Sequence, residues 1–519
     1  MKLWRPLFYG NIVKNNSTLW ALVLLAGLLG SCSRETVPEK YQMRGSWIAS
    51  VKNIDWPSVP GLSVTEQKEE FRRMAGFHAA HGFNALFVQV RPATDAFYKS
   101  DTEEWSQWLT GTQGQAPSPE YDPLQYMIEE THSLGMEFHA WFNPYRAVVD
   151  VGKTETSLSH ITRLKPGWFV KYGENLYFDP GIPEARKYLV DAISNVVSNY
   201  DVDAIHFDDY FYPYPIAGET FPDSASFQKF GRDFQTIEDW RRDNVNKLVK
   251  ELQERIKSLK PYVKFGISPF GVWRNKEQDP EGSETKALSN YDQLYADVLK
   301  WLEQGWIDYV VPQLYWHIGF EIADYTVLAD WWSKHTYGKH LYIGQAVYRV
   351  GSERSEEWKR PEEMGDHLRE NRRHPEILGD VFFNARTFYK NPLGISDTLR
   401  STFYSSPALV PPMPWIDNTP PGAPEGLICN PEKQGVYLAW DQPEEDNPYW
   451  YIIYRGRGKN APDTNDPGNI LAKLRYPVTF FNDKSAVKGK TYTYTVTALD
   501  RLNNESGAPP PITIKYQVK

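Results

Sequence analysis

The sequence predicts an α/β fold, a (β/α)8 TIM barrel, followed by an all-β sandwich. Three observations lead to this fold class. Short β-like runs alternate with helical stretches eight times between residues 41 and 405, a proline-rich segment follows, and strand patterns without helices fill residues 425–519. A chain of 519 residues has room for two or three domains, so we expect the barrel and the sandwich to be separate domains.

The barrel prediction rests on eight runs that alternate with helical patterns. The runs lie at residues 45–51, 85–90, 137–142, 204–207, 264–268, 309–313, 341–346 and 380–384. Between them, residues 183–200 and 237–259 repeat apolar side chains at three- and four-residue spacing, which is typical of helices. Eight such strands in one domain fit a closed parallel barrel. An open doubly wound sheet is the alternative, but no G-x-G-x-x-G follows the first strand, which disfavours its nucleotide-binding form.

The first 31 residues have the pattern of a lipoprotein signal peptide. Lys2, Arg5 and Lys14 precede an apolar run at 19–29, which is shorter than the roughly 20 residues that a membrane-spanning helix needs. The run leads into Leu-Gly-Ser-Cys, which resembles a bacterial lipobox with Cys32 as the lipidated residue. We therefore expect the protein to be secreted across the inner membrane and to be lipid-anchored in the cell envelope, at the outer membrane. Residues 32–40 would form a short tether. The alternative is an ordinary cleaved signal peptide with an incidental cysteine.

A linker and a small β domain are expected after the barrel. Residues 406–424 carry six prolines between positions 411 and 424, which excludes regular helix and indicates a stiff linker. In residues 425–519, the string GKTYTYTVTALD resembles the tyrosine-corner strand of fibronectin type III modules, with Trp440 in the core and Tyr492 at the corner. That resemblance implies a spacer or a docking surface for protein or glycan. Cys429 is the one cysteine besides the lipidated one, so no intramolecular disulfide is expected.

Composition excludes some functions and leaves one open. Lys plus Arg number 57 and Asp plus Glu number 66, a net charge of −9, which argues against a nucleic-acid-binding protein. Aromatic residues make up 15% of the chain. Such rings either fill a large core or stack on ligands with apolar faces, such as sugars. The 11 histidines form no H-E-x-x-H motif and no cluster with other ligand residues, so we expect neither a metal nor a cofactor.

Polar and aromatic residues follow every predicted strand. The active site of a (β/α)8 barrel is built at the carboxyl ends of its strands, so these residues are the candidates for the site. A guanidinium matches the two oxygens of a carboxylate, so Arg91 and Arg146 are each candidates for binding an acidic sugar or for an internal ion pair. The candidates for substrate contact are Gln89, Arg91, Asp95, Trp141, Asn143, Arg146, Tyr210, Trp273, Gln313, Tyr315, Trp316 and Gln345.

Six strings at successive strand ends resemble one family. They are RGSWIASVKNIDWPS, NALFVQVRPATDAFY, HAWFNPYR, IHFDDYFYP, FGISPFGVWRN and DYVVPQLYW. These strings resemble the glycosyl-hydrolase-like 10 family over nearly the whole of residues 41–405. The resemblance implies a (β/α)8 glycosidase that cleaves the glycan strands of peptidoglycan, particularly strands without peptides. Two other functions stay open: a non-catalytic glycan-binding lipoprotein, and a glycosidase for another polysaccharide.

Asp208 and Asp209 are the predicted catalytic residues. They are adjacent carboxylates at the end of the fourth predicted strand. Two carboxylates held close together resist double ionisation, so one keeps a proton near neutral pH, as the general acid of a glycosidase requires. The pair also resembles that of barrel hexosaminidases in which the N-acetyl oxygen of the substrate attacks the anomeric carbon. That resemblance implies that Asp208 orients the acetamide and that Asp209 protonates the glycosidic oxygen and later activates water.

The rival mechanism is a direct double displacement with Asp208 as the nucleophile. It needs a separate proton donor, but the string ISPFGVWRN at the fifth strand contains no Glu. The remaining candidates for that donor are Asp95 and, in the loop after the fifth strand, Asp279, Glu281 and Glu284. The acid pair also has a purely structural interpretation, as helix caps or as a salt bridge to Arg146.

Overall fold

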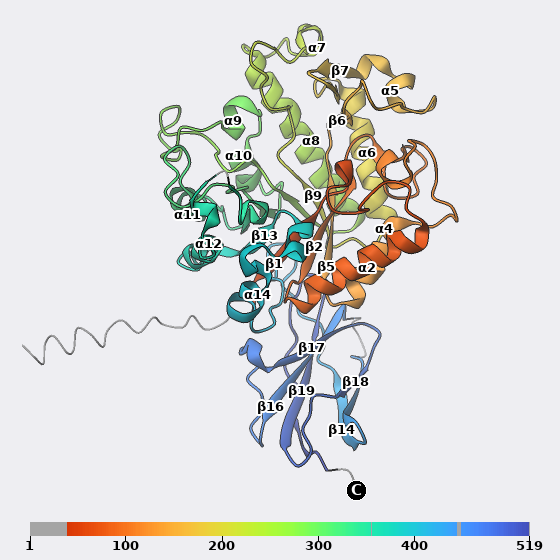
Figure 1. Ribbon diagram of the computed structural model, residues 1–519, viewed down its shortest axis with the longest axis vertical. Helices are drawn as coiled ribbons and strands as arrows, with labels where there is room; N and C mark the ends of the chain where they lie inside the picture. Colours follow the sequence, from red (N-terminus) through yellow and green to blue (C-terminus); the bar gives the residue numbers. More distant parts are fainter. Residues whose placement is uncertain (1–38, 354, 444–447, 518–519) are drawn as a thin grey trace, which may run out of the picture. The chain divides into compact units, whose positions relative to one another are not determined.

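Eight parallel strands close into a barrel in the computed structural model, which describes residues 39–353, 355–443 and 448–517 (Figure 1). Around the barrel the strands follow the order β1-β13-β12-β11-β10-β9-β5-β2, so each strand pairs with its neighbours in the chain. The strands are β1 (Met43–Ile48), β2 (Ala85–Arg91), β5 (Glu137–Phe142), β9 (Ala204–Phe207), β10 (Lys264–Ile267), β11 (Tyr309–Val310), β12 (His340–Gln345) and β13 (Ile377–Phe382). Closure between β1 and β13, with Met43 opposite Gly379, confirms the barrel and excludes the open sheet.

Helices alternate with the strands around the barrel (Figure 1). They include α2 (Val64–Ala80), α4 (Pro123–Ser133), α6 (Pro183–Asn199), α8 (Ile237–Leu259), α10 (Val298–Glu303), α11 (Tyr325–Ser333), α12 (Glu363–Asn371) and α13 (Ala385–Lys390). The start of α2 is a capping box in which Ser63 and Glu66 each bond the other's backbone N–H. Pro123 opens α4 directly after Asp122, whose side chain accepts from Gln125 N. The helices predicted at 183–200 and 237–259 are α6 and α8.

Irregular insertions extend the loops at the carboxyl ends of several strands. The loop after β2 holds β3 (Asp95–Ala96), β4 (Glu104–Trp105) and α3 (Gln107–Thr110), and the loop after β5 holds β6 (Arg146–Val148), α5 (Ile161–Leu164), β7 (Phe169–Tyr172) and β8 (Asn175–Phe178). The loops after β9 and β10 carry α7 (Ser224–Phe230) and α9 (Asn290–Gln293). After α13 the chain turns through α14 (Ile395–Thr398). These insertions surround the end of the barrel where a site is expected.

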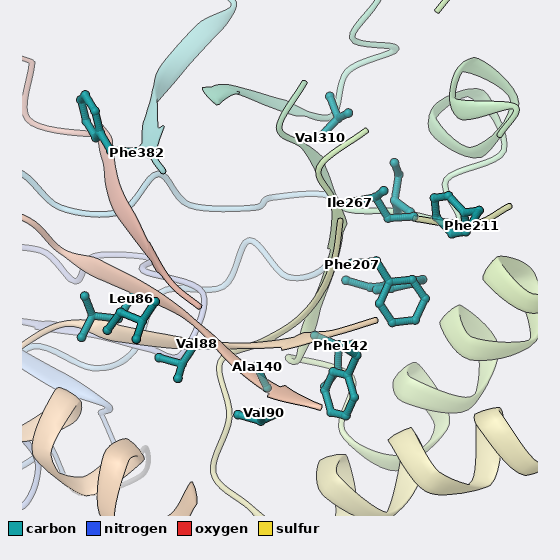
Figure 2. Close-up of a cluster of buried hydrophobic side chains, with 14 of the residues drawn as sticks. Leu86, Val88, Val90, Ala140, Phe142, Phe207, Phe211, Ile267, Val310 and Phe382 are labelled. Carbon is teal, nitrogen blue, oxygen red and sulfur yellow. The ribbon is translucent and has the colours of Figure 1, made fainter. Parts of the chain in front are cut away.

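Side chains alternate between two cores along each barrel strand. Leu86, Val88 and Val90 of β2 point outward to the helices and join Phe142, Phe207 and Phe382 from other strands (Figure 2). Phe87 of the same strand points inward and belongs to a separate cluster inside the barrel. Large rings fill that interior, and small residues make room for them. A Cβ at Gly266, for example, would lie 2.1 Å from the ring of Tyr309.

Two antiparallel sheets form the C-terminal region, as the sequence predicts. One sheet contains β14 (Glu425–Glu432), β15 (Gly435–Asp441) and β18 (Phe480–Asp483), and the other contains β17 (Ile470–Arg475), β16 (Trp450–Arg457), β19 (Thr491–Leu499) and β20 (Ile512–Lys515). Trp440 and Tyr451 pack edge to face between the sheets at 5.3 Å. Tyr492 Oη accepts from Val487 N, which ties the strand to the preceding loop. The fibronectin type III assignment stays a prediction.

Residues 39–519 form one compact unit, and several polar contacts join the barrel to the C-terminal sheets. Asp201 forms ion pairs with Arg475 at 3.1 Å and Arg501 at 2.6 Å. The predicted boundaries at 405 and 425 stay predictions. The predicted signal peptide and the lipidated Cys32 lie outside the described residues. In the described part of the chain, no helix is both long and apolar enough to cross a membrane.

Candidate active site

A cavity of about 310 Å³ opens at the carboxyl ends of the barrel strands. Its walls combine two carboxylates, three amide or hydroxyl groups and many rings. The lining residues are Trp47, Ala49, Val51, Ile54, Gln89, Trp141, Arg146, Asp208, Asp209, Tyr210, Tyr214, Ser268, Gln313, Tyr315, Tyr348 and Phe383. The predicted site residues Gln89, Trp141, Arg146, Asp208, Asp209, Tyr210, Gln313 and Tyr315 are therefore brought together in one place.

Asp208 sits directly after β9 and is held by groups that donate hydrogen bonds. Its Oδ2 accepts from Trp141 Nε1 at 3.2 Å and from Asn143 Nδ2, and its Oδ1 accepts from Tyr210 N at 3.3 Å. The strand register explains these contacts. β5 pairs with β9 so that Phe142 lies opposite Phe207, which places the next residue of each strand, Asn143 and Asp208, side by side.

Asp209 has a different set of partners. Its Oδ2 accepts from Tyr214 Oη, five residues further along the same loop, and its Oδ1 accepts from Gln313 Nε2 at 3.1 Å. Gln313 also donates to the backbone oxygen of Ser268 at 3.1 Å, so its amide is fixed between the ends of β10 and β11. A hydroxyl can donate or accept, whereas an indole or amide N–H only donates. Asp209 therefore has a partner that can accept a hydrogen bond from its protonated form, whereas the groups that contact Asp208 are all N–H donors.

Burial controls the electrostatics of the pair. Asp208 is 6% exposed and Asp209 is 2% exposed. Burial, followed by the neighbouring charge of Asp209, raises the pKa of Asp208 to about 7, and burial also raises the pKa of Asp209. Arg146 opposes the shift at both carboxyls. The two groups titrate as one unit, so the pair retains one proton near neutral pH.

Gln89 sets the direction of the amide that reaches Asp208. Its Oε1 accepts from Ser50 N at 3.0 Å and Val51 N at 2.8 Å, so its Nε2 must point the other way. That nitrogen donates to Asn143 Oδ1 at 2.6 Å. Asn143 therefore presents its own Nδ2 to Asp208. Although Asn143 does not line the cavity, it contacts the acid pair directly.

Rings and one cation form the rest of the wall. The guanidinium of Arg146 lies 4.6 Å from the ring centre of Tyr210. Among residues 39–353, 355–443 and 448–517, no carboxylate lies within ion-pair distance of Arg146, although its charge lowers the pKa of both Asp208 and Asp209. Tyr315 packs edge to face with Tyr348 at 6.0 Å and nearly parallel to Phe383 at 6.4 Å. These rings offer apolar faces of the kind on which sugars stack.

Besides Asn143, five predicted contact residues do not line the cavity. Arg91 forms a fully buried ion pair with Glu103 at 2.6 Å, and Asp95 is buried beside Ser106. Trp273 stacks on Trp331 at 5.9 Å, Trp316 packs against Phe270 at 5.3 Å, and Gln345 donates to Asp380 at 2.8 Å and to Tyr325 at 2.7 Å. We do not include these five residues in the proposed site, because their polar groups or rings are engaged by the protein itself.

Other residues line the cavity without being in the list of candidates for substrate contact, among them Trp47, Ile54, Tyr214 and Phe383. Tyr214 had a usable signal, since it belongs to the aromatic string YFYPY that directly follows the acid pair. Trp47 gave none, because it lies inside a predicted strand and looks like ordinary core. Phe383 follows β13, but an apolar residue at a strand end is not a distinctive signal.

The geometry of the two carboxyls is suited to acid–base chemistry. Asp208 and Asp209 are the only carboxylates among the described residues that line the cavity. Within the described part of the chain, no group of three or more His, Cys, Asp or Glu side chains has the arrangement of a metal site. A buried carboxyl pair that keeps one proton can protonate a leaving group while its charged member stabilises a positive centre.

A (β/α)8 barrel with such a pair in a ring-lined cavity at its strand ends defines the class of protein, a glycoside hydrolase. The model of the glycosyl hydrolase-like 10 family matches residues 42–360, and the chain belongs to this family. This confirms the resemblance seen in the strand-end strings, and the chain is accordingly a glycoside hydrolase.

Two bacterial relatives span most of the chain. The chain is 49% identical to glycosyl hydrolase YngK of Bacillus subtilis, over 90% of this chain and 92% of that protein. It is 37% identical to glycosyl hydrolase DigH of Escherichia coli K12, over 70% of this chain and 91% of that protein. Among solved structures, the PgaB glycoside hydrolase domain of Bordetella bronchiseptica has a TM-score of 0.47 at 12% identity, over 70% of this chain and 98% of that one.

Proposed function

We propose that this glycoside hydrolase cleaves the glycan strands of peptidoglycan, that peptide-free strands are its substrate, and that Asp208 and Asp209 carry the reaction. The observation that carries the proposal is the acid pair itself. It consists of two adjacent buried carboxylates that share one cavity with stacked rings and one unpaired guanidinium. Such a cavity suits a sugar that has apolar faces, acetamide groups and a negative substituent.

The composition of the cavity favours assistance by the substrate's own acetamide over direct double displacement. Double displacement with Asp208 as nucleophile needs a third group as proton donor. None of the acids named for that role lines the cavity, and two of them are engaged elsewhere, since Asp279 pairs with Arg274 at 2.7 Å and Glu284 pairs with Lys276. A mechanism in which the acetamide oxygen attacks the anomeric carbon needs only an orienting carboxylate and an acid, and the cavity supplies these two groups.

The hydrogen bonds divide the two roles between the pair. Asp208 accepts only from N–H donors, which stabilise its charged form, so we assign it to orient the acetamide and to stabilise the positive charge that develops. Asp209 contacts the hydroxyl of Tyr214, which can accept a hydrogen bond from a protonated carboxyl. We therefore assign Asp209 as the acid that protonates the glycosidic oxygen. After the leaving group departs, the same carboxylate activates water.

Arg146 supports the choice of substrate. Its guanidinium lines the cavity, stacks on Tyr210 and donates one hydrogen bond to the backbone oxygen of Pro92 at 3.3 Å. Its remaining N–H groups are available to a carboxylate on the substrate. The lactyl group of muramic acid becomes such a carboxylate once the peptide is removed, which is why we propose peptide-free strands.

The cellular location is proposed from the N-terminal sequence alone. A lipid on Cys32 would anchor the enzyme in the cell envelope, in the outer membrane, where the glycan polymer lies within reach. Cys32→Ala tests this directly. We expect the wild-type protein to incorporate a labelled fatty acid and to fractionate with membranes, and the variant to do neither. Label in the variant, or a wild-type protein without label, would contradict the anchor.

The catalytic test compares three Asp→Asn variants. Asp208→Asn and Asp209→Asn change the pair, whereas Asp279→Asn makes the same chemical change in an acid outside the cavity. Reducing ends released from amidase-treated sacculi are measured beside intact sacculi, chitin and starch, and the products are identified by mass spectrometry. We expect wild type and Asp279→Asn to cleave amidase-treated sacculi best, and both pair variants to be inactive while still binding sacculi.

Each outcome bears on one part of the proposal. Full activity of both pair variants would overturn the catalytic assignment. Preference of the wild type for chitin or starch would overturn the substrate and leave the acid pair in place. Equal cleavage of intact and amidase-treated sacculi would contradict the preference for peptide-free strands.

A further inference from the structure

A chain of five buried side chains runs through the barrel interior, from the cavity to the opposite end. It starts at Trp47, which lines the cavity, and ends at Glu137, the first residue of β5. The links are Trp47 Nε1 to His206 Nε2 at 3.1 Å, His206 Nδ1 to Tyr309 Oη at 3.2 Å, Tyr309 Oη to His139 Nδ1 at 2.9 Å, and His139 Nε2 to Glu137 Oε2 at 2.9 Å. All five residues are buried.

The direction of every hydrogen bond in the chain follows from its two ends. An indole N–H only donates, so His206 Nε2 accepts, and its Nδ1 carries the hydrogen that is donated to Tyr309. The hydroxyl of Tyr309 then donates to His139. Burial lowers the pKa of both histidines, so both rings are neutral and use one nitrogen as donor and the other as acceptor. Every donor and acceptor in the chain is therefore used once.

The far end is an ionic site to which the C-terminal region contributes. Glu137 Oε1 accepts from Lys264 Nζ at 2.5 Å and from Asn503 Nδ2 at 2.8 Å. Burial alone would raise the pKa of Glu137, but the charge of Lys264 holds it well below its usual range. Asn503 follows β19 and has φ of 63°, a left-handed conformation that asparagine tolerates better than most residues. The next residue back, Leu502, packs in the same cluster as Trp47.

A barrel interior does not need such a chain for stability. Buried polar groups lose their hydration, and apolar side chains of similar volume are usually at least as stabilising. What a fully satisfied chain does provide is one orientation of each ring. Rotation of the Trp47 indole would leave His206 Nε2 without a donor in a site that excludes water. Gly344 lies beside the same indole, and a Cβ there would come within 3.2 Å of it.

We propose that this chain positions Trp47 for sugar binding, with Tyr309 as its central link and with Asn503 of the C-terminal region holding Glu137 at its far end. The part that concerns sugar rests on the proposed function. A ring held in its binding orientation before the substrate arrives loses no further rotational freedom when the sugar contacts the part of it that lines the cavity. The C-terminal sheets would then belong to the catalytic unit, in addition to any docking role.

The test uses the full chain and a matched pair of variants. Tyr309→Phe removes the central hydroxyl, whereas Tyr342→Phe removes a hydroxyl that is equally buried in the barrel and bonds His340 at 2.9 Å outside the chain. Asn503→Ala removes the far link without altering the barrel strands. The protein is labelled with 5-fluorotryptophan, and Trp47→Phe assigns the fluorine resonance of residue 47. This readout needs no substrate, so it does not depend on the proposed function.

We expect Tyr309→Phe and Asn503→Ala to shift or broaden the Trp47 resonance, and Tyr342→Phe to leave it unchanged. On glycan strands, the first two should raise KM roughly 2- to 10-fold, the range of a single lost hydrogen bond, with kcat nearly unchanged. In a Trp47→Phe background they should have no further effect on KM.

An unchanged resonance in both chain variants, or an equal shift in Tyr342→Phe, would overturn the proposal. If Tyr309→Phe does not fold, Asn503→Ala decides alone. Shifted resonances with no cleavage of any glycan would leave the positioning intact and count against the proposed function.

Discussion

Asn143 donates its side-chain Nδ2 to Oδ2 of Asp208 across the edge between β5 and β9. The contact is determined by the strand register and by Gln89, which leaves the amide of Asn143 no other orientation. A neutral donor at this point stabilises the charged form of Asp208. The ionisation of the acid pair is therefore set by residues of two neighbouring strands and not by the pair alone.

Asn143→Ala should shift the pH dependence of the enzyme. Loss of the donor raises the pKa of Asp208 further above about 7. Because the proposed role of Asp208 requires its charged form, the acid limb of the kcat/KM profile should move to higher pH. At neutral pH the rate should fall roughly 10- to 100-fold, the range for a hydrogen bond to a charged group. A pH–rate profile measures both effects, and an acid limb at the wild-type position would contradict the link.

Tyr214→Phe should affect Asp209 more than substrate binding. The hydroxyl of Tyr214 is the one partner of Asp209 that can either donate or accept, so its removal disturbs the proton on that carboxyl. We expect kcat to fall roughly 10-fold or more, with KM changed much less. Tyr348→Phe, which removes a hydroxyl from another ring of the cavity wall, is the control. Equal losses in both variants would assign Tyr214 to general packing.

The acid pair should also lower the stability of the folded protein as the pH rises. The carboxyl of Asp208 titrates near its ordinary value of 3.8 when unfolded and at about 7 when folded. Between these values the folded state binds more protons, so its stability falls as the pH increases through this window. Asp208→Asn removes the titration of this carboxyl and leaves that of Asp209. Its melting temperature should exceed that of wild type at pH 8, and the difference should shrink towards pH 4. Parallel melting curves across this range would contradict the raised pKa.

The barrel was predictable because its strands carry the pattern of the fold in the sequence. In β2, Leu86 and Val88 face the helices while Phe87 faces the interior, and polar residues begin where the strand ends. The acid pair was predictable for a related reason, since Asp208 and Asp209 directly follow the short buried strand β9. Both signals are local, so neither required knowledge of the loops.

The rest of the site depends on contacts between distant segments. Arg91 and Arg146 look alike in the sequence, because each follows a predicted strand. What separates them is Glu103, which lies in an irregular loop and pairs with Arg91 inside the protein. The role of Trp47 also depends on contacts between distant segments, because only the closed barrel brings its indole to both the cavity and His206. Sequence spacing does not contain this information.

Arg91 should therefore matter for stability. Its side chain and that of Glu103 are fully buried and form a bidentate pair. Removing one partner leaves an unpaired buried charge, which typically costs about 3–5 kcal/mol of unfolding free energy. We expect Glu103→Gln to lower the melting temperature clearly while the KM of the folded fraction stays at the wild-type value. Denaturant unfolding measures the stability, and initial rates measure KM. A raised KM with unchanged stability would indicate that Arg91 contributes to substrate binding.

Arg146 should matter for substrate choice. Its guanidinium lines the cavity without an ion-pair partner among the described residues, so replacing it breaks no buried ion pair. We expect Arg146→Gln to keep the wild-type melting temperature and to raise KM for peptide-free strands roughly 10-fold or more, because a charge-assisted hydrogen bond to the lactyl carboxylate is lost. The matched substrate is a strand whose lactyl carboxylate has been converted to an amide. For that strand, wild type and variant should have similar KM values. A variant that loses affinity equally for both strands would show that Arg146 acts through its stack on Tyr210 or through the acid pair, and not by recognising an anionic sugar.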